Sequence, residues 1–392
     1  MSVQRYAVRP VFATGKSSGL GIFWFNVAVM LQALSDAVDL SSVSRALVIK
    51  LRHLGDVLLT SPVFSVLKRH VPGIEVDALV YDDTRDMLSG HPAIEQIHVI
   101  GRGSRAEPAA SRAALEWRLF RRLRERRYDL LVHLSEHPRG AWLARTLGCR
   151  YSVAPGLPGR SRFWRQSFSH RFALALNGRR HMVEWNLDAL RRIGIQPGPE
   201  ERSLLLVPGE EAEREAGSLM ARHGLERGAF THLHPASRWS FKCWPAAQNA
   251  ALIAKLVQQG ERVVLTSSSD PAERSFTQDI LSRCPPGVID LSGALSLKTL
   301  AALTARARKF VGVDSAPMHI AAAMGTPVVA LFGPSGEFDW GPWCSSARVV
   351  ASSRHPCRPC GRDGCGGGKL SDCLATLEVD SVLRAIDSLH AG

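Results

Sequence analysis

The chain has 392 residues, a formal net charge of +13 at pH 7, 45% hydrophobic residues and 22% charged residues. That length allows two ordinary domains, and the proportions exclude a disordered or fibrous chain. The positive charge favours a polyanionic partner (nucleic acid, an anionic bilayer surface or a phosphorylated substrate) without choosing among them.

The first 44 residues show no periodicity that connects them with the rest of the chain. Their longest apolar run, residues 20–34, is interrupted by Asn26 and Gln32 and is too short for the roughly 18–20 residues that span a bilayer. No small-residue cleavage site follows it, so we expect an amphipathic helix or appended extension rather than a signal peptide. We therefore predict a cytoplasmic protein with an N-terminal extension over residues 1–44.

From Arg45 onward, apolar strand patterns alternate with helical patterns, which predicts parallel βαβ units. The first half has strands predicted at 46–51, 75–81, 96–100 and 129–134, and helices at 57–70, up to about 127, and at 182–193. Residues 150–181 are rich in arginine and aromatic residues and are expected to be irregular. A linker is predicted at 194–203.

The second half repeats this alternation. Strands are predicted at 231–235, 262–269, 288–293, 309–314 and 328–333, with helices at 246–259, 272–284, 298–307 and from about 317. We predict an N-terminal domain over 45–195 and a C-terminal domain over 196–392. Ligands of open α/β sheets bind beyond the carboxyl ends of the strands, so a cleft there is the expected site.

The first candidate motif, RHLGDVLLTSP at 52–62, joins the first predicted strand to the first predicted helix. Gly55 allows a tight turn, and Asp56 stands at the start of the helix. Asp56 is an ordinary helix cap in one interpretation and a general base at the edge of the sheet in the other. The spacing alone favours the cap.

The second motif, HPASRWSFKCWP at 234–245, follows the first strand of the second half. Lys242 can neutralise a diphosphate as a point charge, and the hydroxyls of Ser237 and Ser240 can donate hydrogen bonds to it. A lysine in a loop is more often simply solvated, so this motif alone is weak evidence for a diphosphate site.

The third motif, GVDSAPMHIAAAMGTPVVALFGP at 312–334, is the most informative. A strand ends at Asp314, the small residues Ser315 and Ala316 allow close backbone approach, and Pro317 suits the first turn of a helix. The free N–H groups of that turn and the helix dipole form an anion site, with His319 in the first turn. The alternative is a buried helix with a core histidine.

Two further patterns match known motifs but lack the structural context that those motifs require. GKSSG at 15–19 matches a nucleophile elbow, but no strand precedes it. GRGSRA at 101–106 resembles a dinucleotide fingerprint, but it follows the third predicted strand rather than the first, which argues against a dehydrogenase.

Four of the eight cysteines, Cys357, Cys360, Cys365 and Cys373, crowd into one glycine-rich segment. Four thiolates can bind zinc, but the second pair is spaced unlike a zinc knuckle. The spacing favours a structural loop of reduced thiols over a metal site.

Two stretches, 117–129 and 159–172, are dense in arginine. They are solvated helix faces in one interpretation and a surface for phosphates or anionic lipid in the other. No recognised nucleic-acid-binding signature accompanies them, so nucleic acid is not the expected partner. The candidate residues are Arg118, Arg121, Arg122, Arg162 and Arg165.

Taken in order, LGDVLL, H-P-x-S-x(4)-K-x-W-P and VDSAPMHIAAAMGTPVVALFG resemble glycosyltransferase family 9, the ADP-heptose:lipopolysaccharide heptosyltransferases. The resemblance runs from about Arg45 to the C-terminus. The segments FKCWP and PCGRDGCGGGKLSDCL resemble the heptosyltransferase III branch, which adds a third heptose to the second inner-core heptose. The family implies an α/β fold of the GT-B type, with two Rossmann-like domains whose parallel sheets face a cleft.

The resemblance also implies roles for the motif residues. Asp56 matches the family's proposed base, which now favours catalysis over capping, and Lys242 matches the lysine at the donor's diphosphate and sugar. Glu273 stands where an acid holds the ribose, and Leu295 stands where an apolar side chain covers adenine, although a core leucine is an alternative. The implied donor-binding residues are Ser237, Lys242, Glu273, Leu295, Asp314, Ser315, Ala316 and His319; the Ser-Ala-Pro here departs from the family's frequent Asp-Thr-Gly.

The implied reaction is an inverting transfer of heptose from ADP-heptose to the lipopolysaccharide inner core. No D-x-D pair occurs in the chain, so no metal or other cofactor is expected. The first half is expected to bind the acceptor through the five arginines named above, with peripheral contact to the cytoplasmic face of the inner membrane. The alternatives are a type I or II heptosyltransferase, another ADP-sugar transferase, or, from other classes, a nucleic-acid-binding or zinc protein.

Overall fold

The computed structural model describes residues 36–102, 109–173 and 179–389. The chain divides into two compact units, Met1–Asp39 and Leu40–Gly392. The patterns at 15–19 and 20–34, and most of GRGSRA, lie outside the described residues. The predicted division between residues 195 and 196 falls inside the second unit and stays a prediction.

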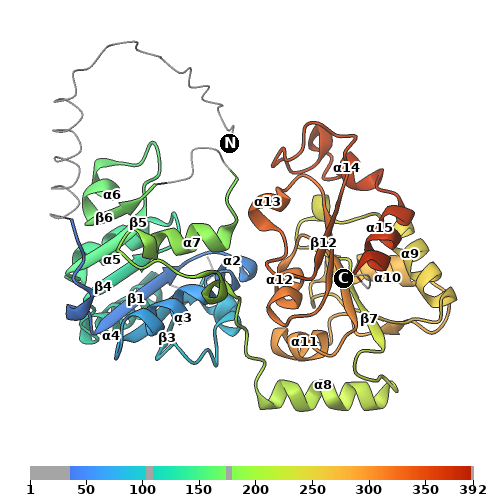
Figure 1. The fold of residues 1–392 in the computed structure, drawn as a ribbon, viewed down its shortest axis with the longest axis horizontal. Coiled ribbons are helices and arrows are strands. Elements are labelled where there is room, and N and C mark those ends of the chain that lie inside the picture. Colours follow the sequence, from blue (N-terminus) through green and yellow to red (C-terminus); the bar gives the residue numbers. More distant parts are fainter. Residues whose placement is uncertain (1–35, 103–108, 174–178, 390–392) are drawn as a thin grey trace, which may run out of the picture. The chain divides into compact units, whose positions relative to one another are not determined.

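The first half contains a six-stranded sheet in the order β3-β2-β1-β4-β5-β6 (Figure 1), and each strand is parallel to its neighbours. Its strands are β1 (Arg45–Lys50), β2 (Glu75–Tyr81), β3 (Ile97–Ile100), β4 (Leu130–His133), β5 (Tyr151–Pro155) and β6 (His170–Phe172).

The second half contains a second six-stranded parallel sheet in the order β12-β11-β10-β7-β8-β9. Its strands are β7 (Phe230–His234), β8 (Arg262–Leu265), β9 (Ile289–Asp290), β10 (Lys309–Val313), β11 (Val328–Phe332) and β12 (Ala347–Ala351). In each sheet the strand order reverses once, between β1 and β4 and between β7 and β10. The predicted α/β class with two Rossmann-like sheets is confirmed.

Helices connect the strands in both halves. In the first half they are α2 (Leu54–Leu58), α3 (Ser61–His70), α4 (Ala109–Glu125), α5 (Pro138–Thr146), α6 (Arg162–Ser167) and α7 (Met182–Arg191). In the second half they are α8 (Glu210–Arg222), α9 (Ala246–Gln258), α10 (Pro271–Leu281), α11 (Leu297–Thr304), α12 (Ala316–Ala323), α13 (Glu337–Trp340), α14 (Asp372–Ala375) and α15 (Val379–Ser388). Short 3-10 helices are η1 (Leu40–Ser42), η2 (Asp82–Met87), η3 (Pro199–Arg202), η4 (Ser240–Lys242) and η5 (Cys365–Gly367).

The single helix predicted over 57–70 is wrong, because two helices occupy this segment. α2 ends at Leu58 and α3 begins at Ser61, with Pro62 in its first turn. Proline has no N–H to continue α2, but it fits the first turn of a new helix, where that N–H would have no partner. The break leaves Asp56 on a one-turn helix of its own.

The prediction that residues 150–181 are irregular is also wrong. This segment contains β5, α6 and β6, which complete one side of the first sheet. β5 ends in a proline and β6 has only three residues. Strands this short lack the apolar run that marks a strand in sequence. They are identified only by their pairing, β5 with β4 and β6 with β5.

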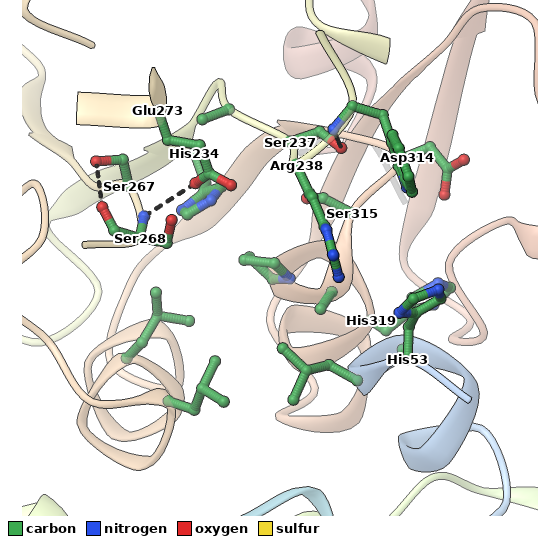
Figure 2. Close-up of a pocket in the computed structure, with 18 of the residues that line it drawn as sticks. His53, His234, Ser237, Arg238, Ser267, Ser268, Glu273, Asp314, Ser315 and His319 are labelled. Atoms are coloured by element: carbon green, nitrogen blue, oxygen red, sulfur yellow. Dashed lines mark hydrogen bonds between the residues drawn. The ribbon is translucent and has the colours of Figure 1, made fainter. Parts of the chain in front are cut away.

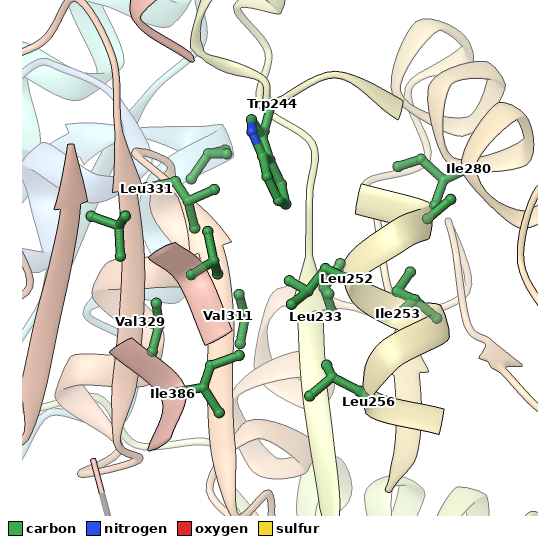
Figure 3. Packing of buried hydrophobic residues seen from close by; sticks show 14 of the residues in the cluster. Leu233, Trp244, Leu252, Ile253, Leu256, Ile280, Val311, Val329, Leu331 and Ile386 are labelled. Carbon is green, nitrogen blue, oxygen red and sulfur yellow. The ribbon is translucent and has the colours of Figure 1, made fainter. Parts of the chain in front are cut away.

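The second sheet is buried on both faces, as its uninterrupted apolar strands require. Against one face, α9, α10 and α15 pack around Leu233, Val311 and Trp244 (Figure 3). Against the other, Met318 of α12 packs on Phe310. None of the described helices is long and apolar enough to cross a membrane.

Candidate functional site

A pocket of about 480 Å³ is formed by segments that follow the carboxyl ends of strands in both sheets. Strands β1, β2 and β3 lead into it from the first half, and β7, β8 and β10 lead into it from the second. Every residue proposed for the donor or for catalysis lines it: Asp56, Ser237, Lys242, Glu273, Leu295, Asp314, Ser315, Ala316 and His319.

Asp56 is the third residue of α2 and is only 8% exposed. Its Oδ2 accepts a hydrogen bond from the backbone N–H of His53 at 3.3 Å, so the capping interpretation is correct for this oxygen. Its Oδ1 lies 3.6 Å from the Nε of Arg52. The carboxylate therefore both caps its helix and borders the pocket, and the two interpretations are compatible.

A buried lysine supports this helix from behind. Lys50, the last residue of β1, donates from Nζ to Oδ1 of Asn186 at 3.1 Å, and Nδ2 of Asn186 donates to the carbonyl of Leu59 at 3.0 Å. Burial lowers the pKa of Lys50 to about 8, while the charge of Asp56 raises it. This network fixes the end of α2 against α7.

Helices α2 and α12 meet at Gly55. A Cβ atom added to Gly55 would lie 2.8 Å from Cδ2 of His319, closer than real Cβ contacts allow. The absence of a side chain at Gly55 thus lets the helix that carries Asp56 approach the start of α12.

The start of α12 has the features of an anion site. Ser315 occupies the N-cap position but makes no side-chain cap, and Pro317 lies in the first turn. Free N–H groups and the helix dipole attract negative charge at such a terminus.

His319, in the same turn, is 3% exposed, and its Nδ1 has no hydrogen-bond partner in the described part of the chain. Burial lowers the pKa of His319 to about 4, against an opposing effect of Asp314. The ring is therefore neutral at pH 7 and offers an unused polar atom where the pocket is lined.

Lys242 and Asp314 form an ion pair, with Nζ 2.6 Å from Oδ2. The lysine side chain is 23% exposed and that of the aspartate 8%. Charge-assisted hydrogen bonds of this kind hold both groups in place, which fixes the position of the ammonium.

The opposite side of the pocket is polar near β8 and apolar near α11. Oε2 of Glu273 accepts the backbone N–H of Ser268 at 3.1 Å, and Ser267 donates to the carbonyl of Ser268 (Figure 2). Leu295 is half-buried, packs against a core cluster and also lines the pocket. Leu295 therefore contacts the core and borders the pocket, and its contact with adenine stays a prediction.

The two serines of the second motif differ in their positions relative to the pocket. Ser237 lines the pocket, whereas the hydroxyl of Ser240 donates to the carbonyl of Lys369 at 3.3 Å and Ser240 does not line it.

None of the five arginines predicted to bind the acceptor lines the pocket. Arg118, Arg121, Arg122, Arg162 and Arg165 are all exposed on α4 and α6. Their role stays a prediction.

Three other arginines line the pocket instead, Arg52, Arg102 and Arg238. Arg52 lies in the first motif and Arg238 in the second. Their positions in these loops could have predicted from the sequence that they line the pocket. Arg102 follows β3. A basic residue at the carboxyl end of a predicted strand was the sequence feature that could have predicted its place in the pocket.

Arg102 is held in a defined orientation. Its guanidinium lies 4.1 Å from the ring centre of Tyr81, and its Nε donates to Asp83 at 2.7 Å. Its Nη2 donates to the carbonyl of Arg52 at 2.8 Å. The pocket therefore has two adjacent cationic side chains on the side of Asp56.

Burial raises the pKa of the Cys373 thiol, and the nearby thiols of Cys365, Cys360 and Cys357 raise it further. Cys357, Cys360 and Cys365 are exposed, and Cys373 is buried. Within the described ranges, no three histidine, cysteine, aspartate or glutamate side chains are grouped so that they could hold a metal ion.

The sequence matches a family model, glycosyltransferase family 9 (heptosyltransferase), over residues 116–370. It is 35% identical to lipopolysaccharide heptosyltransferase 3 of Escherichia coli over 300 aligned residues. This alignment covers 76% of this chain and 85% of the E. coli protein.

Two solved structures share the fold. The glycosyltransferase family 9 protein of Veillonella parvula has a TM-score of 0.75 at 23% identity, covering 90% of this chain and 99% of that one. The E. coli ADP-heptose lipopolysaccharide heptosyltransferase II has a TM-score of 0.69 at 22% identity, covering 88% and 98%. The resemblance expected from the motifs is confirmed.

Proposed function

Because the chain belongs to glycosyltransferase family 9, the heptosyltransferases, we propose that it transfers heptose from ADP-L-glycero-β-D-manno-heptose to the inner-core heptose of lipopolysaccharide. The 35% identity to lipopolysaccharide heptosyltransferase 3 supports the third-heptose reaction over type I or type II transfer. The observation that carries the proposal is the shared pocket, in which a buried carboxylate from the first half borders the anion site of the second.

In this proposal Asp56 is the general base. Its carboxylate accepts the proton of the acceptor hydroxyl while that oxygen forms a bond to the anomeric carbon. The bond from the anomeric carbon to the β-phosphate oxygen breaks as ADP leaves, through a transition state with oxocarbenium character. A single displacement inverts the configuration at the anomeric carbon.

The negative charge that grows on departing ADP is stabilised by fixed groups. Lys242 supplies a cation held by Asp314, and the first turn of α12 supplies free N–H groups. His319 is neutral and offers its ring nitrogen as a hydrogen-bond partner for the donor. These groups supply what a divalent metal supplies in other transferases, so we propose a metal-independent reaction.

The nucleoside of the donor occupies the β8–α11 side of the pocket. Oε1 of Glu273 is available to a ribose hydroxyl, because Oε2 already accepts the N–H of Ser268. Leu295 covers adenine together with its neighbours Leu297 and Leu300, which line the same wall. Ser237 contacts the diphosphate from the loop after β7.

The acceptor approaches Asp56 from the first half, where Arg52 and Arg102 attract its anionic groups. The five exposed arginines of α4 and α6 act on the anionic lipid around it. Residues 45–195 form the acceptor-binding domain and 196–392 the donor-binding domain. The protein works at the cytoplasmic face of the inner membrane and has no nucleic-acid partner.

The test is an incubation of the full chain with ADP-heptose and purified lipopolysaccharides that carry no, one or two inner-core heptoses. The proposal predicts one heptose added to the acceptor with two. Transfer to the acceptors with no or one heptose would assign type I or type II activity. Transfer to none of them, with an intact fold, would refute the proposed function.

A further inference from the structure

The surface formed by α4 and α5 carries large apolar side chains in solvent. Residues 110–118, two and a half turns of α4, are exposed throughout. Leu115 is 56% exposed, Trp117 is 61% exposed, and Trp142 on α5 is 60% exposed. A helix in a globular protein normally buries one face, but among the described residues no element covers this part of α4.

A second cavity, of about 680 Å³, lies between these helices. Its wall is largely apolar and aromatic, with Leu119, Phe120 and Leu123 from α4 and Leu143 from α5, and both tryptophans border it. Since none of its lining residues lines the first pocket, it is separate from the proposed active site.

The charge around this cavity is predominantly positive. Helix α4 contains five arginines and two glutamates. Both glutamates already have partners, because Glu116 binds Arg139 at 2.6 Å and Glu125 binds Arg121 at 3.4 Å.

Helix α6 extends the same surface. It contacts α5, and the rings of Trp142 and Phe163 lie 4.7 Å apart. Arg162 and Arg165 of α6 are exposed beside this contact. The two arginine-rich stretches of the sequence are thereby joined through α5.

We propose that this α4–α5 surface, defined by Leu115, Trp117 and Trp142 with the arginines of α4 and α6, docks the enzyme on an anionic phospholipid bilayer. Tryptophan prefers the boundary between headgroups and acyl chains, and basic residues beside an apolar helix face are attracted to anionic headgroups. The inference rests on the proposed function only in expecting a lipid-linked acceptor.

A bilayer suits these observations better than a protein partner does. A second copy of this chain would bring the same excess of arginine against itself, and like charges facing each other across an interface oppose association. An anionic bilayer neutralises the arginines and accepts the tryptophans at the same time.

The test measures binding of the full chain to sedimented vesicles without any substrate. Vesicles of phosphatidylglycerol and phosphatidylethanolamine should bind the protein, and vesicles of phosphatidylcholine should not. Binding should weaken in 0.5 M NaCl, because salt screens the arginines. Brominated acyl chains should quench tryptophan fluorescence of the bound protein.

Two variants separate the apolar and the charged contributions. The pair Trp117→Ser and Trp142→Ser should lower vesicle binding at least tenfold and reduce the bromine quenching. The pair Arg118→Gln and Arg122→Gln should lower binding and flatten its salt dependence. All four residues are exposed, so the thermal unfolding midpoint should stay unchanged.

Matched controls lie in the second half. Leu370→Ser removes another apolar side chain that is 68% exposed, and the pair Arg222→Gln and Arg227→Gln removes two exposed charges. Both should bind vesicles like the wild type. Transfer to a deacylated, water-soluble acceptor should be the same for the wild type, the tryptophan pair and both controls.

The inference is overturned if the wild type ignores anionic vesicles, or if the tryptophan and arginine pairs bind them like the wild type. It is also overturned if the wild type dimerises without lipid and the tryptophan pair abolishes the dimer. A protein that binds vesicles through this surface but transfers no heptose would retain the inference and refute the proposed function.

Discussion

The ammonium of Lys242 lies 2.6 Å from the carboxylate of Asp314, and this pair joins the loop after β7 to the end of β10. These two strands are neighbours at the point where the order of the second sheet reverses. Ligands of open α/β sheets bind at that point, because the loops on either side diverge and leave a crevice. The ion pair thus marks the place where a diphosphate would enter.

Replacing Lys242 with alanine should weaken ADP-heptose binding about 10- to 100-fold and lower turnover as well. The variant loses the cation near the diphosphate and leaves the carboxylate of Asp314 without its partner. Calorimetric titration with ADP-heptose measures the affinity. Lys255→Ala, which breaks a 2.6 Å pair with Asp380 elsewhere in the same half, is the matched control and should bind normally. Unchanged donor affinity in Lys242→Ala would remove the lysine from the donor site.

Replacing Gly55 with alanine should lower transfer about tenfold or more while the protein still folds. The added methyl group would stand 2.8 Å from the ring of His319, so α2 must move away from α12 and take Asp56 with it. Steady-state kinetics with both substrates measures the effect. Gly217→Ala in α8 is the control, because a Cβ there meets nothing within 4 Å and alanine favours a helix. Wild-type kinetics for Gly55→Ala would show that this close approach is unimportant.

Much of the site was predictable because its residues lie in three short motifs, each placed directly after a predicted strand. The motifs located Asp56, Lys242 and His319 in one pocket, since parallel strands bring their carboxyl ends to one edge. The contact of Gly55 with His319 was not predictable, because it joins residues far apart in the chain.

Arg102 was missed for a related reason. Its orientation depends on Tyr81, Asp83 and the carbonyl of Arg52, which are distant in sequence and give no local pattern. The short strands β5 and β6 were missed because pairing within the sheet, rather than an apolar run, defines them.

Lowering the pH should destabilise the folded protein at pH values well above those at which carboxylates titrate. Burial lowers the pKa values of five histidines to about 3 or 4: His91, His133, His232, His234 and His319. Because the folded state excludes protons from these rings, their stabilising contribution is complete above the unfolded pKa of about 6.5 and declines as the pH falls from there toward 4. Each ring contributes a slope of up to about 1.4 kcal/mol per pH unit.

Urea unfolding at pH 7.0 and 5.5 tests this expectation, and the free energy of unfolding should fall by more than about 2 kcal/mol. His91→Asn should have a shallower slope, because asparagine retains an acceptor for the N–H of Ala93 and does not titrate. An unfolding free energy that is equal at the two pH values contradicts the prediction.

Transfer should survive excess EDTA, because Lys242 and the first turn of α12 provide the positive charge at the leaving group. Initial rates with and without chelator measure this. Loss of activity that magnesium or manganese restores would overturn the metal-independent reaction. Loss that zinc alone restores would instead assign a structural metal to the segment that contains Cys357 and Cys373.

The most direct measurement of the central claim is the single-turnover rate of heptose transfer by Asp56→Asn, together with its ADP-heptose affinity. We expect a rate at least about 100-fold below wild type with donor affinity within about twofold, since Asp56 acts on the acceptor hydroxyl. Asp83→Asn, which removes another carboxylate from the same pocket, should keep its turnover rate at saturating acceptor. A rate near wild type for Asp56→Asn would show that Asp56 is not the general base.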